Sequence, residues 1–288
     1  MALPTMARGF HRDTFVSWCH GVDDGPFSSI STGDRITFHN PDLMVTTAVA
    51  AALTERVRVV TNVVVLPLHA TATVAKQLAT IDVLSNGRLT VGVGVGGREA
   101  DYRAVGAPFG RRHQRLDDAV AGLRHLWAGT APFDGADPVG PSPLQPGGPP
   151  LLAGALGPRA MERAAAWAEG VTGFSISGSR AEVEGTNNLA RQAWARAGRE
   201  RPPRLVSGTF YVLGTSEPLD DLRRFAFEYL RVFGDQVASS LASALEVATP
   251  ERLRTVLEDA EAAGCDEFIL VPGTVDPACL EATVGVLS

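Results

Sequence analysis

The sequence has 288 residues, 45% hydrophobic and 20% charged, which is enough to bury a sizeable core in one large domain or two small ones. Its net charge of −6 comes from interspersed signs and argues against non-specific binding to nucleic acid. The N-terminal MALPTMARGFHRDTF has no apolar signal segment and no run of about 18 apolar residues follows, so the sequence predicts neither secretion nor a membrane span.

Apolar, β-rich runs alternate with amphipathic helical patterns through the first half of the chain. The strongest helical pattern covers 111–129, where Leu116, Val120 and Leu123 recur on one face. In chain order we predict a weak strand near 3–8, a strand over 25–34, a helix over 41–55, a strand over 56–67, a helix over 71–87, a strand over 88–96 and the helix over 111–129.

A proline- and glycine-rich segment over 130–150 interrupts this alternation. It contains seven prolines, which suits an irregular excursion rather than a packed element. The alternation then resumes in the same style. We predict strands over 150–156, 171–177, 204–214 and 266–273, and helices over 157–170, 180–198, 217–264 and 276–287.

The predicted strands are almost continuously apolar, as in a sheet covered on both faces. Seven clear strands and the weak first one give eight βα units in 288 residues, the size and count of a (β/α)8 TIM barrel. A doubly wound sheet uses the same alternation, but no half of the chain stands alone as a five- or six-stranded domain. We therefore predict an α/β fold with a single (β/α)8 barrel domain over 1–288.

The stretch LTVGVGVGGREADY contains Gly92, Gly94 and Gly97 in the spacing G-x-G-x-x-G. A dinucleotide-binding fingerprint of this form opens its domain and has its acidic residue at the end of the next strand. Here the glycines lie in the fourth unit, and Asp117 and Asp118 fall inside a predicted helix. The glycines therefore indicate space beside a barrel strand, filled either by neighbouring side chains or by a flat ligand.

Two possible anion sites follow neighbouring strands. The turn Gly154–Gly157 leads into Pro158 at the first position of a helix, where free N–H groups and the helix dipole favour an anion. After the next strand, Ser177, Ser179 and Arg180 offer hydroxyls and a cation. Each is also compatible with an ordinary turn, but barrel active sites gather at this edge of the sheet.

Polar residues also follow two earlier strands. Asp34 and Arg35 end the strand over 25–34, and His69 lies just past the strand over 56–67. These positions suit an active site. A local ion pair, an N-cap role for Asp42, or a structural histidine are the alternatives.

Three cysteines form no C-x-x-C pair, and six histidines show no H-x-x-x-H or H-E-x-x-H spacing. The sequence therefore predicts reduced thiols in a cytoplasmic protein, and no metal site.

The run TNVVVLPLHATATVAKQLATIDVLSNGRLTVGVGVGGREADYRAVGAPFGRR resembles the bacterial luciferase-like flavin-dependent oxidoreductase superfamily. Its signature is A-K-Q-x-A-T-x-D-x-L-S-x-G-R-L, followed by G-V-G-V-G and EADYRAVG. The likeness covers residues 10–180 well and the remainder loosely.

The resemblance implies a (β/α)8 barrel that binds reduced FMN or the deazaflavin coenzyme F420, with the ring at the carboxyl ends of the strands. The third strand of relatives often has a bulge with a non-proline cis peptide. Relatives that use F420 often carry Asp-His where this chain has Asp34 and Arg35, and Glu at the position of Gly97, so FMN remains open. By analogy, the ring would lie along Asn62, Val63 and Val64 and beside Gly96, Gly97 and Arg98, and the phosphate on Gly154, Ala155, Leu156, Gly157, Ser177 and Arg180.

The sequence thus predicts a cytoplasmic oxidoreductase that carries out monooxygenation or hydride transfer on a small organic substrate. Asp34, Arg35 and His69 are the candidates for contact with the reacting edge, with Asp34 or His69 as a proton relay. The segments 97–110 and 130–150 are expected to cover the substrate. The resemblance, and not any residue of the chain, implies a homodimer and a separate flavin reductase as partners. The alternative is a barrel without cofactor or catalysis that binds a phosphorylated metabolite.

Overall fold

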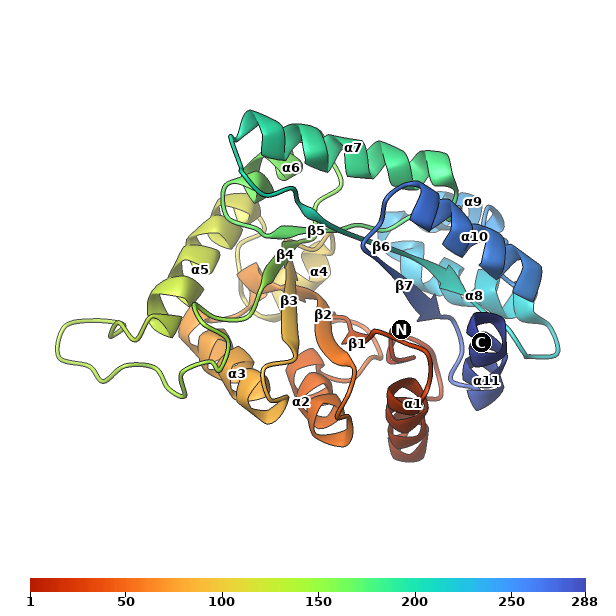
Figure 1. The fold of residues 1–288 in the computed structure, drawn as a ribbon, viewed down its shortest axis with the longest axis horizontal. Helices are drawn as coiled ribbons and strands as arrows, with labels where there is room; N and C mark the ends of the chain where they lie inside the picture. Colours follow the sequence, from red (N-terminus) through yellow and green to blue (C-terminus); the bar gives the residue numbers. More distant parts are fainter.

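The structure, a computed structural model, describes residues 1–288. Seven parallel strands form one curled sheet in which each strand pairs with its neighbour in the sequence, and helices cover its outer face (Figure 1). A doubly wound sheet would reverse its strand order at a switch point, so the sequential order excludes that alternative. The strands are β1 Ser29–Thr32, β2 Arg58–Val65, β3 Leu89–Gly94, β4 Leu151–Ala153, β5 Gly170–Thr172, β6 Arg204–Tyr211 and β7 Glu267–Pro272.

Several helices begin at residues that suit helix N-termini. Asp42 accepts a hydrogen bond from the N–H of Val45 (2.9 Å), so it caps its helix, as one of the sequence alternatives proposed. Proline occupies the first helical position in four other helices. The helices are α1 Arg12–Asp24, α2 Leu43–Leu53, α3 Thr71–Leu84, α4 Glu99–Ala104, α5 Arg112–Trp127, α6 Pro158–Ala165, α7 Arg180–Arg196, α8 Pro218–Leu230, α9 Asp235–Ser243, α10 Pro250–Ala262 and α11 Pro277–Leu287, with 3₁₀ turns η1 Leu66–Leu68 and η2 Arg231–Phe233.

The N-terminal residues differ from the predicted first strand near 3–8. Ala2 makes an isolated parallel bridge with Ser31 of β1, and its N–H donates to the carbonyl of Leu270 in β7 (2.8 Å). The chain then turns, with Ala7 N–H donating to Pro4 O. Of the eight predicted strands, seven are therefore present, and the N-terminal residues hydrogen-bond to both edge strands of the sheet.

Two other predictions on secondary structure were wrong. The helical pattern over 217–264 is three helices, α8, α9 and α10, because Gly234 (φ 91°) and the segment 244–249 interrupt it. Helix α4 was not predicted, since the segment 97–110 was expected to be a loop. Most of the shorter strands also end before their predicted limits, where the chain leaves the sheet.

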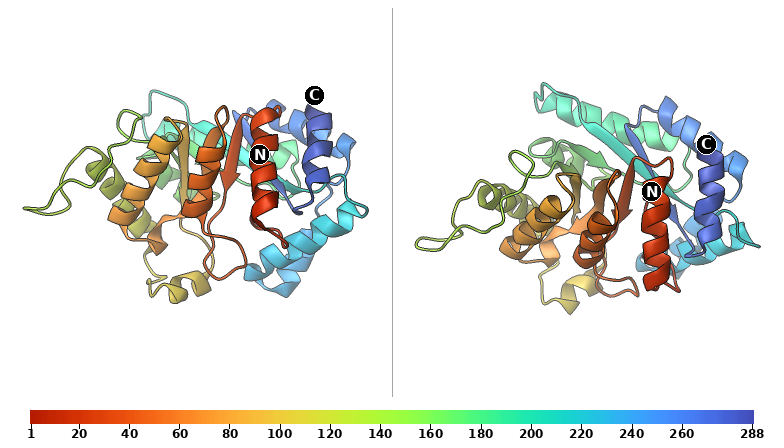
Figure 2. Two further views of the ribbon diagram at one scale, coloured as in Figure 1. Left: turned by 90° about the horizontal axis from the view of Figure 1, so that it is seen from below. Right: turned by 60° about the horizontal axis from the view of Figure 1, so that its bottom comes forward.

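The excursion over 130–150 contains neither helix nor strand, as predicted. It runs out beyond α3 and α5 (Figure 2). It returns to the amino-terminal side of the sheet: Asp82 accepts hydrogen bonds from the N–H groups of Leu144 and Gln145, and Gln145 Nε2 donates to Leu89 O at the first residue of β3. The segment connects a helix end to a strand start and lies opposite the edge where the active site is predicted, which argues against the expectation that it covers the substrate.

The main core lies between the sheet and its helices, and the tryptophans of the helical segments are buried there, Trp18 completely. Burial raises the pKa of the Cys19 thiol to about 12 and that of Cys279 to about 11, so neither thiol is reactive at neutral pH. None of the helices combines the length and the apolar character that crossing a bilayer requires.

Candidate functional site

Asp34 and His69 form a hydrogen-bonded pair at the carboxyl ends of β1 and β2. Asp34 Oδ2 lies 2.8 Å from His69 Nε2 and also accepts from the N–H of Val65 (3.0 Å). The Asp34 side chain is 5% exposed and that of His69 is 24% exposed. An ionised carboxylate only accepts hydrogen bonds, so His69 Nε2 donates and Nδ1 remains able to exchange a proton. The sequence-predicted residues Asp34 and His69 are thus brought together.

Arg35 points away from this pair and forms no ion pair with Asp34, so the local ion pair considered for the sequence is absent. Its Nη2 donates to Tyr229 O on α8 (2.9 Å), and its guanidinium lies 3.6 Å from the Tyr229 ring centroid and 4.7 Å from that of Phe38. Its Nη1 is buried without a hydrogen-bond partner. Burial lowers the pKa of Arg35 below its usual range.

Gly94 in β3 and Gly154, directly after β4, make room for an irregularity in β2. The Asn62–Val63 peptide is cis, where the resemblance implied it, and the β2–β3 register shifts between Thr61 and Val64. A Cβ on Gly94 would lie 2.9 Å from Val63 Cγ2, and one on Gly154 3.2 Å from Val63 Cγ1. Of the two alternatives for this space, a neighbouring side chain is the one that fills it.

Asn62 and the residues at the end of β3 complete this part of the site. Thr172 Oγ1 on β5 donates to Asn62 Oδ1 (2.8 Å), which fixes the Asn62 side chain across the interior of the sheet. A Cβ on Gly96 would meet Val65, whereas one on Gly97 would have no heavy atom within 4 Å. Of these two glycines, Gly97 is the one beside open space.

Arg98 joins two segments of the rim. Its Nη2 donates to Thr37 O (3.0 Å), and its Nε lies 3.6 Å from Asp101 Oδ1 on α4. Asp101 in turn accepts from the N–H of Thr37 (2.7 Å). These contacts hold the loop 33–42 against α4, which makes Arg98 part of the rim.

The turn Gly154–Gly157 has the properties of an anion site. The N–H groups of Ala155, Leu156 and Gly157 donate to no acceptor within the chain. Gly157 is the N-cap of α6, and a Cβ there would have no heavy atom within 4 Å. Free donors at the positive end of a helix dipole favour a phosphate.

The neighbouring loop after β5 already holds an anion, the carboxylate of Glu182 on α7. This carboxylate accepts from the hydroxyls of Ser175 (2.8 Å) and Ser177 (2.6 Å) and from the N–H groups of Ile176 and Ser177 (both 3.0 Å). Burial by itself would raise the pKa of Glu182, but these hydrogen bonds outweigh it and the pKa is lowered. Arg180 is largely exposed and lies 3.5 Å from Glu184.

Sequence reasoning missed Glu182, although a signal was present. Ser179 is the N-cap of α7 and Glu182 is its third helical residue, the S-x-x-E spacing of a capping box. Such a glutamate accepts hydrogen bonds from the backbone just before the helix. The spacing could therefore have predicted that the hydroxyl and the N–H of Ser177 donate to a carboxylate within the chain.

An aromatic cluster at the carboxyl end of β6 was also missed. The Phe210 ring centroid lies 4.5 Å from that of Phe174 and 5.2 Å from those of Phe225 and Tyr229. Phe225 and Tyr229 are four residues apart on α8, a spacing that places side chains on one helix face. Phe38 contacts Tyr229 edge to face. These rings, with Arg35 between two of them, form an apolar wall beside the site.

An open hollow of about 680 Å³ lies at the mouth between the loop 33–42, α4 and the α8–α9 region. Figure 2 shows α4, α8 and α9 together on this side of the molecule. The hollow has room for a small organic molecule. Its lining includes Phe38, Gly97, Arg98, Phe109, Glu228 and Arg231.

Comparison with known sequences gives one family. The family model of luciferase-like monooxygenases matches residues 10–271. An uncharacterised protein of Mycobacterium tuberculosis is 34% identical over 174 residues, 58% of this chain and 60% of that protein. The oxygenase component of a flavin-dependent trigonelline monooxygenase from Acinetobacter baylyi is 28% identical over 161 residues, 52% of this chain and 45% of that protein. The matched part thus spans between 45% and 60% of these relatives.

Solved structures share the fold over nearly the whole chain. Monooxygenase RslO1 from Streptomyces bottropensis has a TM-score of 0.77 at 24% identity, covering 100% of this chain and 95% of that one. An F420-dependent secondary alcohol dehydrogenase, solved with an F420–acetone adduct, has a TM-score of 0.74 at 17% identity, covering 95% and 92%. The oxygenating constituent of 3,6-diketocamphane monooxygenase from Pseudomonas putida, solved with FMN, has a TM-score of 0.72 at 14% identity, covering 100% and 96%.

The family match covers most of the chain, and the curled parallel sheet is the one these solved structures have. The family match confirms the resemblance that rests on the run of residues between β2 and α5. The chain belongs to the luciferase-like monooxygenase family.

Proposed function

We propose that the chain is an oxidoreductase that uses reduced FMN or coenzyme F420 for monooxygenation or hydride transfer on a small organic substrate. The observation that carries this proposal is the row of three free N–H groups at Ala155–Gly157, at the same edge of the sheet as the Asp34–His69 pair. FMN comes first, because the Acinetobacter relative is flavin-dependent and the Asp34-Arg35 pair departs from the pattern of F420 enzymes.

The cofactor phosphate would bind the N–H groups of Ala155, Leu156 and Gly157. The ring would lie along Asn62–Val64 and beside Gly96–Arg98, where Gly97 leaves open space. Ser177, after the neighbouring strand, would join the phosphate site only when Glu182 releases its hydroxyl, and Arg180 only when its guanidinium turns from Glu184.

The bound flavin or deazaflavin supplies the two-electron chemistry. The chain binds and orients the reactants and moves a proton. Asp34 fixes the His69 ring through Nε2, so that Nδ1 exchanges a proton with the substrate. The aromatic wall, with the Arg35 guanidinium packed against Phe38 and Tyr229, excludes water from the reacting edge.

We extend the proposal to partners and location. The Acinetobacter relative is named an oxygenase component, which supports a separate flavin reductase. A homodimer is proposed from the family likeness alone. Three free cysteines support a cytoplasmic location.

We also propose that the sheet closes as a (β/α)8 barrel, in which Met1–Leu3 take the place of an eighth strand because they hydrogen-bond to both β1 and β7.

A matched pair of variants at Gly157 tests the phosphate site. Asp is a good N-cap residue and has room here, but its carboxylate competes for the free N–H groups and repels phosphate. We expect Gly157→Asp to keep or raise the melting temperature and to weaken FMN binding about tenfold or more, measured by fluorescence quenching. Gly157→Asn is the neutral control and should bind several-fold better than Gly157→Asp.

If the unaltered protein quenched the fluorescence of neither FMN nor F420, the oxidoreductase proposal would be contradicted. If simple phosphate esters bound in their place, the alternative of a metabolite-binding barrel would be supported. Equal FMN binding by the Asp and Asn variants would place the phosphate elsewhere.

A further inference from the structure

A second hollow of about 680 Å³ lies on the amino-terminal side of the sheet, opposite the candidate site. Its walls come from the first residues of β2 and β6, from the start of β4, from the returning end of the 130–150 excursion and from the α7–β6 loop. This face of a barrel usually serves stability alone. Here six of the eleven lining residues are charged, and the apolar ones are Leu152 and three prolines.

Four guanidinium groups line this hollow: Arg58, Arg199, Arg201 and Arg204. Arg204 Nη2 donates to Glu267 (2.7 Å), the one ion pair among them. Arg58 bonds only to neutral oxygens, with Nη2 donating to Thr90 Oγ1 (2.6 Å) and weakly to Leu89 O (3.4 Å).

The other two arginines also lack acidic partners. Arg199 Nη1 donates to the carbonyl of Ala165 (2.8 Å), and Arg201, at the exposed edge of the hollow, has no hydrogen bond within the chain. Three of the four cations therefore have no carboxylate within ion-pair distance.

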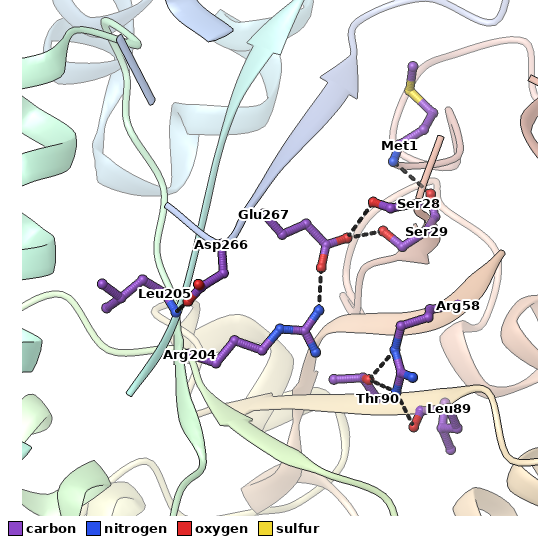
Figure 3. Close-up of polar contacts among 10 residues, drawn as sticks. All are labelled: Met1, Ser28, Ser29, Arg58, Leu89, Thr90, Arg204, Leu205, Asp266 and Glu267. Carbon is purple, nitrogen blue, oxygen red and sulfur yellow. Dashed lines mark hydrogen bonds and ion pairs between the residues drawn. The ribbon is translucent and has the colours of Figure 1, made fainter. Parts of the chain in front are cut away.

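The acidic residues of the lining make no ion pair with these cations, although the charge of Glu169, with those of Glu267 and Asp82, partly offsets the repulsion at Arg58. Glu169 and Asp266 are both exposed and neither pairs with an arginine, and Asp266 accepts from the N–H of Leu205 (2.7 Å). Figure 3 shows the Arg204 guanidinium on Glu267 and, beside it, the Arg58 guanidinium on Thr90 and Leu89. Burial, and next the Arg204 charge, lower the pKa of Arg58. Like charges around one hollow repel unless an anion lies between them.

We propose that this hollow binds a compact oxyanion with at least two charges, of phosphate chemistry, held by Arg58, Arg201 and Arg204. Guanidinium groups bind phosphate oxygens with paired hydrogen bonds, which suits a site built from arginines without a lysine. The anion would join the α7–β6 loop to the strand ends, so its binding stabilises the fold and leaves the chemistry at the opposite face unchanged.

Thermal unfolding without flavin tests this site. Inorganic pyrophosphate represents a free anion and ribose 5-phosphate a phosphate ester, each compared with citrate and with sodium chloride at equal ionic strength. We expect pyrophosphate or the ester to raise the melting temperature by about 3 °C or more at saturation. Gly157→Asp should keep this rise, which separates it from the proposed flavin phosphate site.

Substitution of the arginines then locates the effect. Arg201→Gln should weaken the apparent affinity about tenfold without loss of stability, because Arg201 is exposed and unbonded. Arg58→Gln should weaken it further. Arg12→Gln, at an 85% exposed side chain on α1, is the control and should change nothing.

Three results would overturn the proposal: a rise no larger than that in sodium chloride, a rise with citrate but with neither phosphate compound, or titrations unchanged in both Arg201→Gln and Arg58→Gln.

Discussion

His69 is the residue best placed to move a proton in the candidate site, and Asp34 determines which of its nitrogens is free. Asp34 also accepts from the N–H of Val65, so one carboxylate fixes both the ring and the end of β2. An amide at position 34 keeps an acceptor for Val65 but offers His69 a weaker, uncharged partner.

We therefore expect Asp34→Asn and His69→Gln each to lower turnover about a hundredfold while FMN binding changes little. The measurements are the rate of substrate-dependent oxidation of the reduced cofactor and a binding titration. Asp34→Ala with full turnover would remove the pair from the mechanism.

Glu182 contributes to stability in a pH-dependent way. Its folded-state pKa is lowered from the ordinary value of 4.5, so the charged form stabilises the fold fully above that pH, and this contribution is lost as the pH falls through the lower folded value. We expect Glu182→Gln to reduce the free energy of unfolding by about 1 kcal/mol at pH 7, since the group is only partly buried.

Urea unfolding at pH 7 and at pH 3 checks this expectation, and the difference between Glu182→Gln and the unaltered protein should shrink at pH 3. Glu184→Gln, whose carboxylate pairs only with Arg180 at the surface, is the control. A difference independent of pH would show that shape, and not charge, is what Glu182 contributes.

At the scale of elements, the bulge in β2 depends on glycines in the strand beside it. A methyl group on Gly94 would press on Val63, so Gly94→Ala should destabilise the fold by about 1–3 kcal/mol. The cost should fall by about 1 kcal/mol in a Val63→Ala background, measured as a double-mutant cycle by denaturant unfolding. Gly97→Ala, which meets no atom, should be neutral, and a Gly94→Ala variant as stable as Gly97→Ala would refute the contact.

The same elements show what a single sequence can and cannot predict. The alternation of strands and helices follows from local patterns of apolar residues, and Asp42 and Pro158 are local signals at helix starts. Whether Gly94 faces a ligand or Val63 depends on the register between two strands, which no local pattern contains. The aromatic wall likewise unites Phe38, Phe174 and Phe210 from three distant segments.

At the scale of the whole molecule, our proposals assign separate tasks to the carboxyl and the amino ends of the strands. Asp34, His69 and the Gly154–Gly157 turn could be assigned to one edge from the sequence, because carboxyl ends of neighbouring parallel strands meet there. The same rule assigns 130–150 to the opposite edge, since it joins the end of α5 to the start of β4. The expectation that this segment covers the substrate did not take that connection into account, and the connection argues against it.

Shortening the excursion tests this separation of faces. Replacing 132–138 by a short Gly-Ser link leaves in place Leu144 and Gln145, whose N–H groups bond to the fully buried Asp82. We expect FMN affinity and KM within about twofold of the unaltered protein, because loop length affects stability only weakly and this loop lies far from the mouth. Shortening the rim segment 105–110 by the same method is the comparison, and it should raise KM. A KM that rises on loss of 132–138 would mean that the excursion reaches the substrate after all.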